Sequence, residues 1–499
     1  MQNLTTQLRF HARQMPGREA LVYGETRLTW AELEARVLRL AGGLAAKGIG
    51  PDSIVALVMK NSAAFVELVY AVSHLGAVLL PTNFRLSGEE LDYITSHAGV
   101  DLIVADEEFA GVLSGLAAPV ILLDQAAQAD CGRVLGSDPA PGAHPRSGND
   151  LMRLMYTSGT TDRPKGVTHS YENYHCKNMD LILALQLSAQ DRLCMTGPLY
   201  HVGACDLPGM AVHTMGGTLI VLRDYDPQTV IDTIAAERIT GIWLAPVMTS
   251  GLLALDRSAL PDLASLKWCI AGGERTPESR IRDFGGVFPN ARYIDAYGMT
   301  ETVSGDTLME PGREIEKIGS VGRPVSMVEL EIRDDEGQNL PAGEIGEICM
   351  RGPKVTRGYW KDPERTAAAM FGDGFLRSGD VGYLDEEGFL FLTDRKKDMI
   401  ISGGENIASS ELERVIHMMD EVADVAVVAR PDERWGEVPL AAIVLREGAT
   451  LDLESLVGFC RAHLAGFKCP KDMRILDDLP RNPSGKILKR VLRDRFLTE

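Results

Sequence analysis

Short apolar runs alternate with amphipathic, helix-like segments from the first residue to about Asp394. Residues 54–58 read Ile-Val-Ala-Leu-Val, residues 102–104 read Leu-Ile-Val, and residues 120–123 read Val-Ile-Leu-Leu. Strands that are apolar throughout are buried on both faces, as in parallel sheets that helices cover on both sides. The pattern therefore predicts an α/β fold with parallel-rich sheets for residues 1–394.

The pattern changes after Pro324. Residues 328–332 and 346–350 alternate apolar and polar side chains, and acidic turns that contain glycine follow near Asp335 and Glu386. A period of two is typical of antiparallel strands with one solvated face. We expect a small antiparallel sheet or β-barrel over about residues 325–393.

A run of five charged residues, 394–398, separates two apolar strands and begins a compact α+β pattern. From charge alone, this run is equally well explained as a solvated turn. Ser410 and Glu413 have the spacing of a capping box at the start of a helix. We predict an N-terminal domain over residues 1–394 and a C-terminal domain over residues 395–499.

The 499-residue chain, with 45% hydrophobic and 24% charged residues, has the composition of a globular enzyme. Its net charge of −19 argues against a general nucleic-acid-binding surface. The eight cysteines are scattered without metal-like spacing, which suits a reducing compartment. Neither a signal peptide nor a membrane span is evident, so we expect a cytoplasmic protein without a transmembrane segment.

Residues 156–167 read Tyr-Thr-Ser-Gly-Thr-Thr-Asp-Arg-Pro-Lys-Gly-Val and follow the strand-like residues 151–155. Backbone N–H groups and hydroxyls in such a loop are strong donors to anionic oxygen, and Lys165 adds a positive charge. The Walker A pattern is excluded, because Pro164 precedes the lysine and no Ser or Thr follows it. A plain Ser/Thr-rich surface loop is the alternative. The candidate phosphate ligands are Thr157, Ser158, Gly159, Thr160, Thr161 and Lys165.

Residues 297–302, Tyr-Gly-Met-Thr-Glu-Thr, follow another strand-like stretch. An aromatic side chain at a strand end can stack on a flat base, and a glycine after it lets the backbone approach a ligand. Thr300 can donate to a phosphate oxygen, Glu301 can hold Mg²⁺ bound to that phosphate, and Asp295 can accept from an exocyclic amine. Each residue taken singly is as readily structural as functional.

Two further stretches present single polar groups on tight turns. Asp380 ends the turn Ser-Gly-Asp and can accept both hydroxyls of a ribose, or merely cap the turn. Lys486 lies in the loop Pro-Arg-Asn-Pro-Ser-Gly-Lys-Ile, where a point charge suits a carboxylate or phosphate oxygen in a transition state. An ordinary surface lysine is the alternative.

Together these stretches resemble the acyl-adenylate-forming superfamily of acyl-CoA synthetases, aryl-CoA ligases, luciferases and peptide-synthetase adenylation domains. The resemblance runs from about Thr29 to Arg490, and its ordered motifs make it specific. The matching stretches are residues 156–166, 198–201 (Pro-Leu-Tyr-His), 297–301, 378–380, 394–406 and 483–486.

The resemblance implies a two-step ligase that uses ATP, Mg²⁺ and CoA. A small carboxylic acid attacks the α-phosphorus of ATP and releases pyrophosphate, and a thiol then displaces AMP from the acyl-adenylate. By the family pattern, residues 157–165 hold pyrophosphate, Glu301 holds the metal and Lys486 bridges acyl and phosphoryl oxygens. The other implied nucleotide and catalytic residues are Asp295, Ala296, Tyr297, Gly298, Thr300, Asp380, Arg395 and His201.

In the second step the resemblance implies a rotation of the C-terminal domain about Lys397, which withdraws Lys486. Gly403 and Gly404 would then reach the thiol tunnel. Trp435 would stack on the adenine of CoA, with a core aromatic as the alternative. Cys469 stands where some relatives have an arginine, so Lys468 is the implied phosphate ligand of CoA, with Lys471 as the alternative. Asp162 also departs from the family pattern.

The resemblance places the acyl pocket at His201, Ala204, Trp243, Gly272, Val303 and Ser304, with Asn178 or Asp180 at its rim. Trp243 would fill space and offer a flat face to a ring. We therefore expect a compact aromatic or short- to medium-chain acid. A core tryptophan that points away from the site, and with it a long-chain fatty acyl-CoA synthetase, is the alternative.

Other readings stay open at the level of sequence. A stand-alone adenylation enzyme that loads a carrier protein would share these motifs, although the chain contains no carrier module. A nucleotide sensor without turnover is disfavoured by the presence of Glu301 and Lys486. A homodimer is one assembly that the family allows.

Overall fold

A computed structural model of the chain describes two compact units. The described residues are 3–140, 142–157, 164–272, 276, 278–395, 398–402, 405–432, 434–481 and 487–497. The first unit comprises Met1–Leu330, Met350–Leu376 and Glu387–Leu390, and the second comprises Glu331–Cys349, Arg377–Glu386 and Phe391–Glu499. The boundary predicted at residue 394 stays a prediction.

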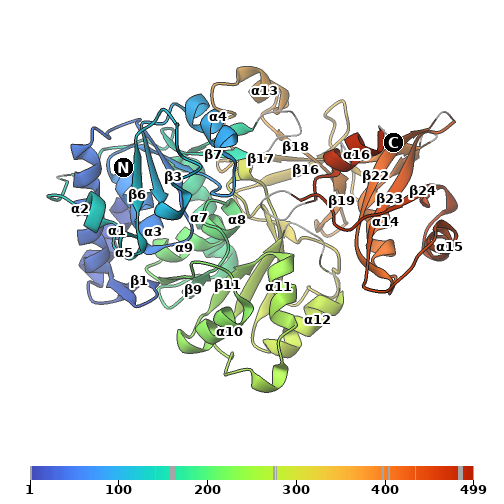
Figure 1. The fold of residues 1–499 in the computed structure, drawn as a ribbon, viewed down its shortest axis with the longest axis horizontal. Helices are drawn as coiled ribbons and strands as arrows, with labels where there is room; N and C mark the ends of the chain where they lie inside the picture. The colour runs from blue at the N-terminus through green and yellow to red at the C-terminus, as the bar shows by residue number, and fades with distance from the viewer. Residues whose placement is uncertain are drawn as a thin grey trace. The chain divides into compact units, whose positions relative to one another are not determined.

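The first unit contains a six-stranded sheet in the order β6-β5-β3-β4-β7-β8. Figure 1 labels its strands β3, β6 and β7. All neighbours pair in parallel except β7 and β8, which form an antiparallel hairpin. Every residue of β3 and β5 is buried, which confirms the prediction of strands covered on both faces. The strands are β3 (Ile54–Val58), β4 (Val78–Pro81), β5 (Leu102–Asp106), β6 (Val120–Leu123), β7 (Leu151–Thr157) and β8 (Lys165–Ser170).

A nine-stranded sheet of order β15-β14-β13-β12-β11-β9-β10-β1-β2 completes the sheets of the first unit. It is parallel from β13 to β1 and antiparallel at both ends. The strands are β1 (Glu19–Tyr23), β2 (Thr26–Thr29), β9 (Arg192–Met195), β10 (Thr218–Val221), β11 (Gly241–Leu244), β12 (Trp268–Gly272), β13 (Arg292–Tyr297), β14 (Thr307–Leu308) and β15 (Arg323–Pro324).

Helices cover these sheets because their buried stripes match the apolar faces of the strands. Val230, Ile231 and Ile234 of α10, for example, pack into one core cluster with Ile242 and Cys269 of the sheet. The helices of the first unit are α1 (Thr5–Gln14), α2 (Trp30–Ala46), α3 (Ala63–His74), α4 (Gly88–Ala98), α5 (Gln125–Ala129), α6 (Gly132–Leu135), α7 (Tyr171–Leu185), α8 (Val202–Asp206), α9 (Gly209–Thr214), α10 (Pro227–Ala236), α11 (Pro246–Leu253), α12 (Glu278–Val287) and α13 (Pro363–Ala368). Each described helix is too short or too polar to traverse a bilayer.

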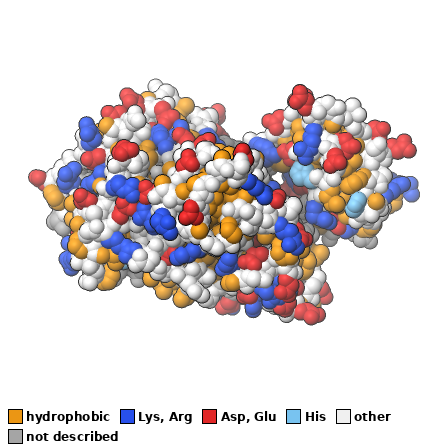
Figure 2. All heavy atoms as spheres, turned by 90° about the horizontal axis from the view of Figure 1, so that it is seen from below, with side chains coloured by type: hydrophobic (Ala, Val, Ile, Leu, Met, Phe, Trp, Pro, Cys, Tyr) orange, Lys and Arg blue, Asp and Glu red, His pale blue; other side chains and the backbone are white. Residues whose placement is uncertain are grey.

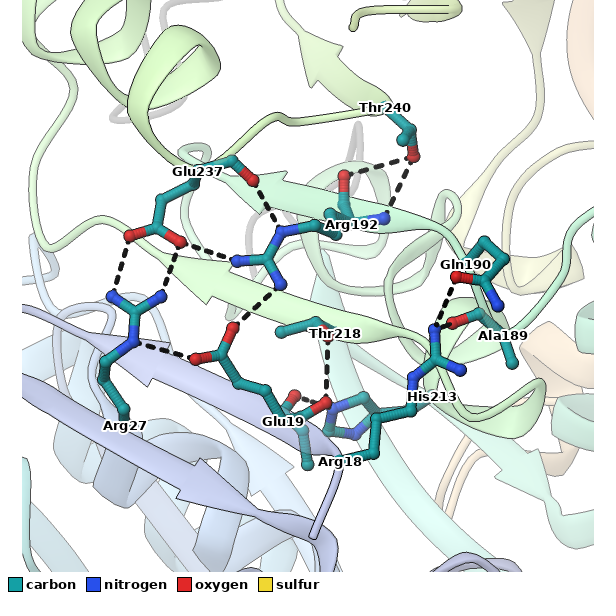
Figure 3. A network of polar contacts seen from close by, with 11 residues as sticks. Arg18, Glu19, Arg27, Ala189, Gln190, Arg192, His213, Thr218, Glu237 and Thr240 are labelled. Carbon is teal, nitrogen blue, oxygen red and sulfur yellow. Dashed lines mark hydrogen bonds and ion pairs between the residues drawn. The ribbon is translucent and has the colours of Figure 1, made fainter. Parts of the chain in front are cut away.

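A closed ring of charges ties the β1–β2 hairpin to the rest of its sheet (Figure 3). Arg27 binds Glu237 with both terminal nitrogens at 2.8 Å and Glu19 through Nε at 2.8 Å. Arg192 of β9 contacts the same two carboxylates, at 2.8 Å and 2.6 Å. Because each carboxylate has two cationic partners, the network holds the terminal hairpin in register at a solvent-facing edge, where isolated pairs contribute little.

The alternating residues 328–332 and 346–350 lie in and around β16 and β17, as predicted. These strands belong to a four-stranded sheet of order β16-β17-β18-β19. Its strands are β16 (Glu329–Arg333), β17 (Gly346–Arg351), β18 (Leu376–Leu384) and β19 (Leu390–Arg395).

The second unit is built on a five-stranded sheet of order β21-β20-β23-β22, with β24 paired to β23. Along β22, Val425 and Val427 belong to one core cluster, whereas Ala426 and Val428 belong to another. This alternation means that both faces of the sheet are covered. The elements are β20 (Ile400–Ser402), β21 (Glu405–Ile407), β22 (Val422–Asp432), β23 (Gly436–Leu445), β24 (Asp472–Ile475), α14 (Ser409–Ile416), α15 (Leu453–His463) and α16 (Lys489–Leu497).

The capping box predicted at Ser410 and Glu413 is wrong. Helix α14 begins at Ser409, and its cap residue Ala408 makes no side-chain cap hydrogen bond. The Ser410 hydroxyl donates instead to the Thr393 carbonyl, and the Glu413 carboxylate accepts from the Val427 N–H at 2.7 Å. Both side chains therefore form hydrogen bonds with residues distant in sequence instead of capping the helix.

Candidate active site

Several predicted site residues follow neighbouring parallel strands at one sheet edge. Trp243 and Gly272 lie at the ends of β11 and β12, Tyr297 ends β13, and His201 lies in the connection after β9. The carboxyl ends of parallel strands meet at the same edge, where ligands bind in open α/β sheets. Topology therefore gathers residues that are far apart in the sequence.

The phosphate motif forms the connection of the β7–β8 hairpin. Thr157 and Lys165 are paired across it, whereas Ser158, Gly159, Thr160 and Thr161 lie outside the described residues. The Thr157 hydroxyl oxygen is buried, and within the described part of the chain it has no hydrogen-bond partner. An orphaned buried donor at the start of this loop fits an anionic ligand oxygen.

Helix α4 contacts both flanks of the same loop, which sequence reasoning missed. His97 Nδ1 lies 2.6 Å from the Tyr156 hydroxyl, and the Tyr93 hydroxyl donates to the Pro164 carbonyl at 3.2 Å. Burial lowers the pKa of His97, so its imidazole stays neutral. These contacts fix the two ends of the hairpin connection.

Lys165, Glu301 and Tyr359 form a compact triad. Lys165 Nζ lies 2.8 Å from Glu301 Oε1 and donates to the Tyr359 hydroxyl at 2.6 Å. That hydroxyl donates in turn to Glu301 Oε1 at 2.9 Å. Burial, followed by the charge of Glu301, raises the pKa of Tyr359, which therefore stays a donor. The structure thus joins the lysine and the carboxylate of two predicted motifs through a tyrosine that sequence reasoning missed.

Glu301 is suited to Mg²⁺ bound together with a nucleotide. It is 3% exposed and lies in the 3-10 turn Thr300–Thr302, and its backbone carbonyl accepts from Thr356 N–H at 2.7 Å. Among the described residues, no three His, Cys, Asp or Glu side chains gather as a metal cage. One fixed carboxylate matches Mg²⁺, which usually keeps waters and completes its shell with substrate phosphates.

A buried ionic network lies behind Thr300 and also escaped the sequence reasoning. Arg153 of β7 binds Asp206 of α8 with both terminal nitrogens, at 3.1 Å and 2.7 Å. Arg153 also donates to His169 Nδ1, and His169 Nε2 donates to the Thr300 carbonyl at 2.6 Å. Burial and the neighbouring Arg153 lower the pKa of His169 to about 3. The imidazole that links Arg153 to the Thr300 carbonyl is therefore neutral. Lys177 adds a second cation beside Asp206.

The predicted adenine site lies at the end of β13. Asp295 is 5% exposed and accepts from the Thr276 hydroxyl at 2.6 Å, and burial raises its pKa to about 6. Ala296 and Tyr297 are buried beside it. A Cβ on Gly298 would lie 2.5 Å from the Gly305 nitrogen, so this position requires glycine. Thr276 is a partner that no local pattern indicated.

Trp243 packs directly against the turn that begins at His201. A Cβ on Gly203 would lie 2.7 Å from Trp243 Cζ2, and one on Gly197 would lie 2.5 Å from Cζ3 and 2.8 Å from Ala204 Cβ. The indole therefore contacts Gly197, Gly203 and their surroundings on the side of His201. Exposed His201 accepts from Gly203 N–H through Nδ1 at 3.1 Å, which leaves Nε2 as the protonated nitrogen of a neutral ring.

The other predicted pocket residues lie on two segments, Gly272 beside β13, and Val303 and Ser304 near the end of α8. A Cβ on Gly272 would lie 2.7 Å from the Ala296 carbonyl, and one on Gly305 would lie 3.0 Å from Leu207 Cδ1, just after α8. Val303 and Ser304 therefore belong to a segment that packs on the end of the helix carrying Ala204. Of the two rim candidates, Asn178 lines a cavity of about 330 Å³ beside α1, and Asp180 is buried in an ion pair with Lys354, which also donates to the Ser304 carbonyl. Their place at the rim of the pocket stays a prediction.

The remaining predicted residues belong to the second unit. Asp380 lies in β18, where its N–H donates to the Ser378 hydroxyl at 3.0 Å, and only the backbone of Arg395 in β19 is described. Trp435 is 43% exposed, so the alternative of a core aromatic is wrong. Lys468 pairs with Glu411 at 2.7 Å, and Cys469 is buried. Lys397, Gly403, Gly404 and Lys486 lie outside the described residues.

Comparison with known proteins accounts for nearly the whole chain. Residues 8–360 match the family model of the AMP-binding enzymes, and residues 411–486 match the model of the AMP-binding enzyme C-terminal domain. The feruloyl-CoA synthase of an Amycolatopsis species is 38% identical, covering 97% of each chain. The long-chain-fatty-acid–CoA ligase FadD13 of Mycobacterium tuberculosis is 35% identical, covering 99% of each chain.

A solved structure shows the same architecture. The o-succinylbenzoate CoA synthetase MenE of Bacillus subtilis, in complex with ATP and magnesium ion, has a TM-score of 0.87 and 31% identity, covering 99% of each chain. Matches of this extent confirm both the α/β fold and the resemblance that the motifs carry. The chain therefore belongs to the AMP-binding enzyme family.

Proposed function

We propose that the chain is an ATP-dependent ligase that joins a compact, ring-bearing carboxylic acid to CoA through an acyl-adenylate. The observation that carries the choice of acid is the packing of the Trp243 indole against Gly197 and Gly203 beside His201. An indole there occupies depth that a long chain would need, and it offers a flat face to a ring. The feruloyl-CoA synthase at 38% identity supports an aromatic acid, whereas FadD13 at 35% supports the alternative of a long-chain acid.

Adenylation requires two charges of the triad to exchange partners. In the structure Lys165 and Glu301 neutralise each other at 2.8 Å, and Tyr359 bridges them. Glu301 would hold Mg²⁺ bound to ATP, and Lys165 would bind a phosphate, so neither charge would be left unpaired. When bound, Mg²⁺ supplies charge neutralisation to the phosphates. Thr157 contributes its hydroxyl, which has no hydrogen-bond partner among the described residues.

The acid selectivity is tested by Trp243→Gly. We expect this variant to accept longer chains and to lose about tenfold or more in kcat/KM for a cinnamate-sized acid, because a ring contact and its buried area disappear. Initial rates of acyl-CoA and AMP formation with benzoate, cinnamate, hexanoate and palmitate measure the shift. Trp243→Phe, which keeps an aromatic face, is the matched control and should retain the preference for the ring. If the unchanged enzyme prefers palmitate to all three smaller acids, the assignment of a compact acid is wrong.

Asp295 predicts a pH dependence of ATP binding. Its pKa is raised to about 6 by burial, so the carboxylate is charged at neutral pH and becomes protonated as the pH falls through about 6. Protonation removes the charge that strengthens the bond from the exocyclic amine of adenine and leaves a weaker neutral acceptor, so the KM for ATP should rise several-fold between pH 7 and pH 5. The KM for the acid serves as internal reference. Asp295→Asn, which keeps a carbonyl acceptor at every pH, should flatten the dependence of the KM for ATP on pH. If this variant shows the same pH dependence as the unchanged enzyme, Asp295 does not contact the adenine.

CoA as the acceptor and the cytoplasm as the compartment belong to the same proposal. Exposed Trp435, with the Arg434 guanidinium 4.8 Å from its ring centre, supports stacking on the adenine of CoA. All eight cysteines are free thiols, which fits a reducing compartment. A homodimer is one assembly that the family allows, and the single chain does not test it.

A further inference from the structure

Three consecutive residues after the predicted metal ligand adopt left-handed backbone conformations. Val303, Ser304 and Gly305 have φ angles of 58°, 69° and 71°, and we call residues 303–305 the left-handed turn. Only glycine adopts this region freely, and a β-branched residue there is an outlier. Strain of this kind persists only where the surroundings hold it, and it clusters at functional sites.

A buried lysine holds the left-handed turn. Lys354 is fully buried, and its Nζ donates to the carbonyls of Gly305 at 2.6 Å and Ser304 at 3.3 Å. The same nitrogen lies 3.1 Å from Asp306 Oδ1 and 3.6 Å from Asp180 Oδ2. One ammonium group thus donates to two carbonyls of a strained turn and forms ion pairs with two buried carboxylates.

The two carboxylates are anchored on separate elements. Asp180 of α7 accepts from the Ser326 hydroxyl at 2.8 Å and from Met327 N–H at 2.9 Å. Asp306 accepts from the Thr302 hydroxyl. Because Asp180 and Asp306 are both held in place, they fix the position of the Lys354 ammonium group. The ammonium group in turn fixes the two carbonyls of the turn to which it donates.

The left-handed turn connects the predicted nucleotide and acid sites. Asp306 N–H donates to the Tyr297 carbonyl at 2.8 Å, and Ser304 N–H donates to the Met299 carbonyl at 3.0 Å. On its other side the turn packs against Leu207, at the end of the helix that carries Ala204. A shift of the turn would therefore move one wall of the proposed acid pocket.

We propose that Lys354 is a positioning residue for acid recognition, which holds the left-handed turn so that Val303 and Ser304 form a rigid wall of the pocket. This inference rests on the proposed function, because it assigns the pocket to a carboxylic acid. If Lys354 served stability alone, its replacement would lower the melting temperature. The KM for the acid would then not rise more than the KM for MgATP.

Two variants test the left-handed turn, one by changing the buried charges that hold it and the other by changing its backbone. The double variant Lys354→Met/Asp306→Asn removes one buried charge of each sign and keeps side-chain volume, which buried pairs tolerate better than a single neutralisation. Asp180 loses its cation but keeps its hydrogen bonds from Ser326 and Met327. Ser304→Gly leaves the charges intact and frees the backbone at φ 69°. The matched controls are Glu67→Gln, in a buried pair with Arg36 at 2.6 Å, and Gln186→Gly, an exposed left-handed residue with φ 53° at the end of α7.

The measurement is acid-dependent exchange of pyrophosphate into ATP with a cinnamate-sized acid, together with the melting temperature. We expect the KM for the acid to rise about tenfold in the double variant and several-fold in Ser304→Gly, with the KM for MgATP within about twofold. Ser304→Gly should melt no lower than the unchanged enzyme. Glu67→Gln should melt lower with both KM values unchanged, and Gln186→Gly should keep both KM values.

Unchanged KM for the acid in Ser304→Gly would overturn the inference, and so would an equal rise in both KM values in either variant. If the double variant does not fold, Ser304→Gly with Gln186→Gly decides whether acid recognition needs the rigid turn, on which the role of Lys354 depends. An unchanged enzyme without exchange for any acid of the panel would overturn the proposed function and this inference with it. Exchange that is normal in the enzyme and in Ser304→Gly alike would overturn only the role of the turn.

Discussion

Replacement of Glu301 by glutamine is expected to slow acid-dependent exchange of pyrophosphate into ATP by about 10²–10³-fold. The substitution keeps the shape of the side chain and an acceptor for the Tyr359 hydroxyl, which lies 2.9 Å away. It removes the only negative charge within the triad, so Mg²⁺ loses its proposed carboxylate ligand and Lys165 loses its partner at 2.8 Å. The loss should appear in the rate of adenylation and in a weaker apparent affinity for Mg²⁺.

Exchange rates over a Mg²⁺ titration measure both effects. Glu316→Gln is the matched control, because its side chain is exposed and pairs with Arg313 at 2.7 Å away from the triad. Its Mg²⁺ dependence should equal that of the unchanged enzyme. The same dependence in Glu301→Gln would show that the carboxylate does not hold the metal.

Lys486→Ala is expected to lower the rate of adenylation by a similar factor, about 10²–10³-fold, the scale of losing a key electrostatic donor in a transition state. This prediction rests on the sequence, where Pro483, Ser484 and Gly485 present the lysine on a short loop. Thioester formation from supplied acyl-adenylate and CoA should be preserved, because the family pattern withdraws the lysine before that step.

Separate assays of the two half-reactions test the assignment. Arg461→Ala, at an exposed position of α15 in the same unit, is the control for loss of a positive charge and should leave both rates unchanged. Equal losses in both half-reactions of Lys486→Ala would refute a role confined to adenylation.

The layout of the sheets and the places of the motifs were predictable because both depend on local pattern. Residues 54–58 and 102–104 are apolar throughout, and they became fully buried parallel strands. The phosphate motif and the adenine motif each follow a strand, so their place at the carboxyl ends of β7 and β13 follows from chain direction alone. Where a local motif had competing long-range partners, as at Ser410 and Glu413, the prediction failed.

The amino-acid sequence by itself determined the α/β architecture, the family and the order of the motifs, since short-range spacing encodes all three. Only the tertiary structure decided which side chains meet. Tyr359 joins Lys165 to Glu301 across 194 and 58 positions of the chain, and Lys354 reaches a turn about 50 positions before it. Trp243 faces the His201 turn because Gly197 and Gly203 leave room for its ring. Charge pairing and close packing act through space, so their partners have no fixed spacing that a sequence pattern could reveal.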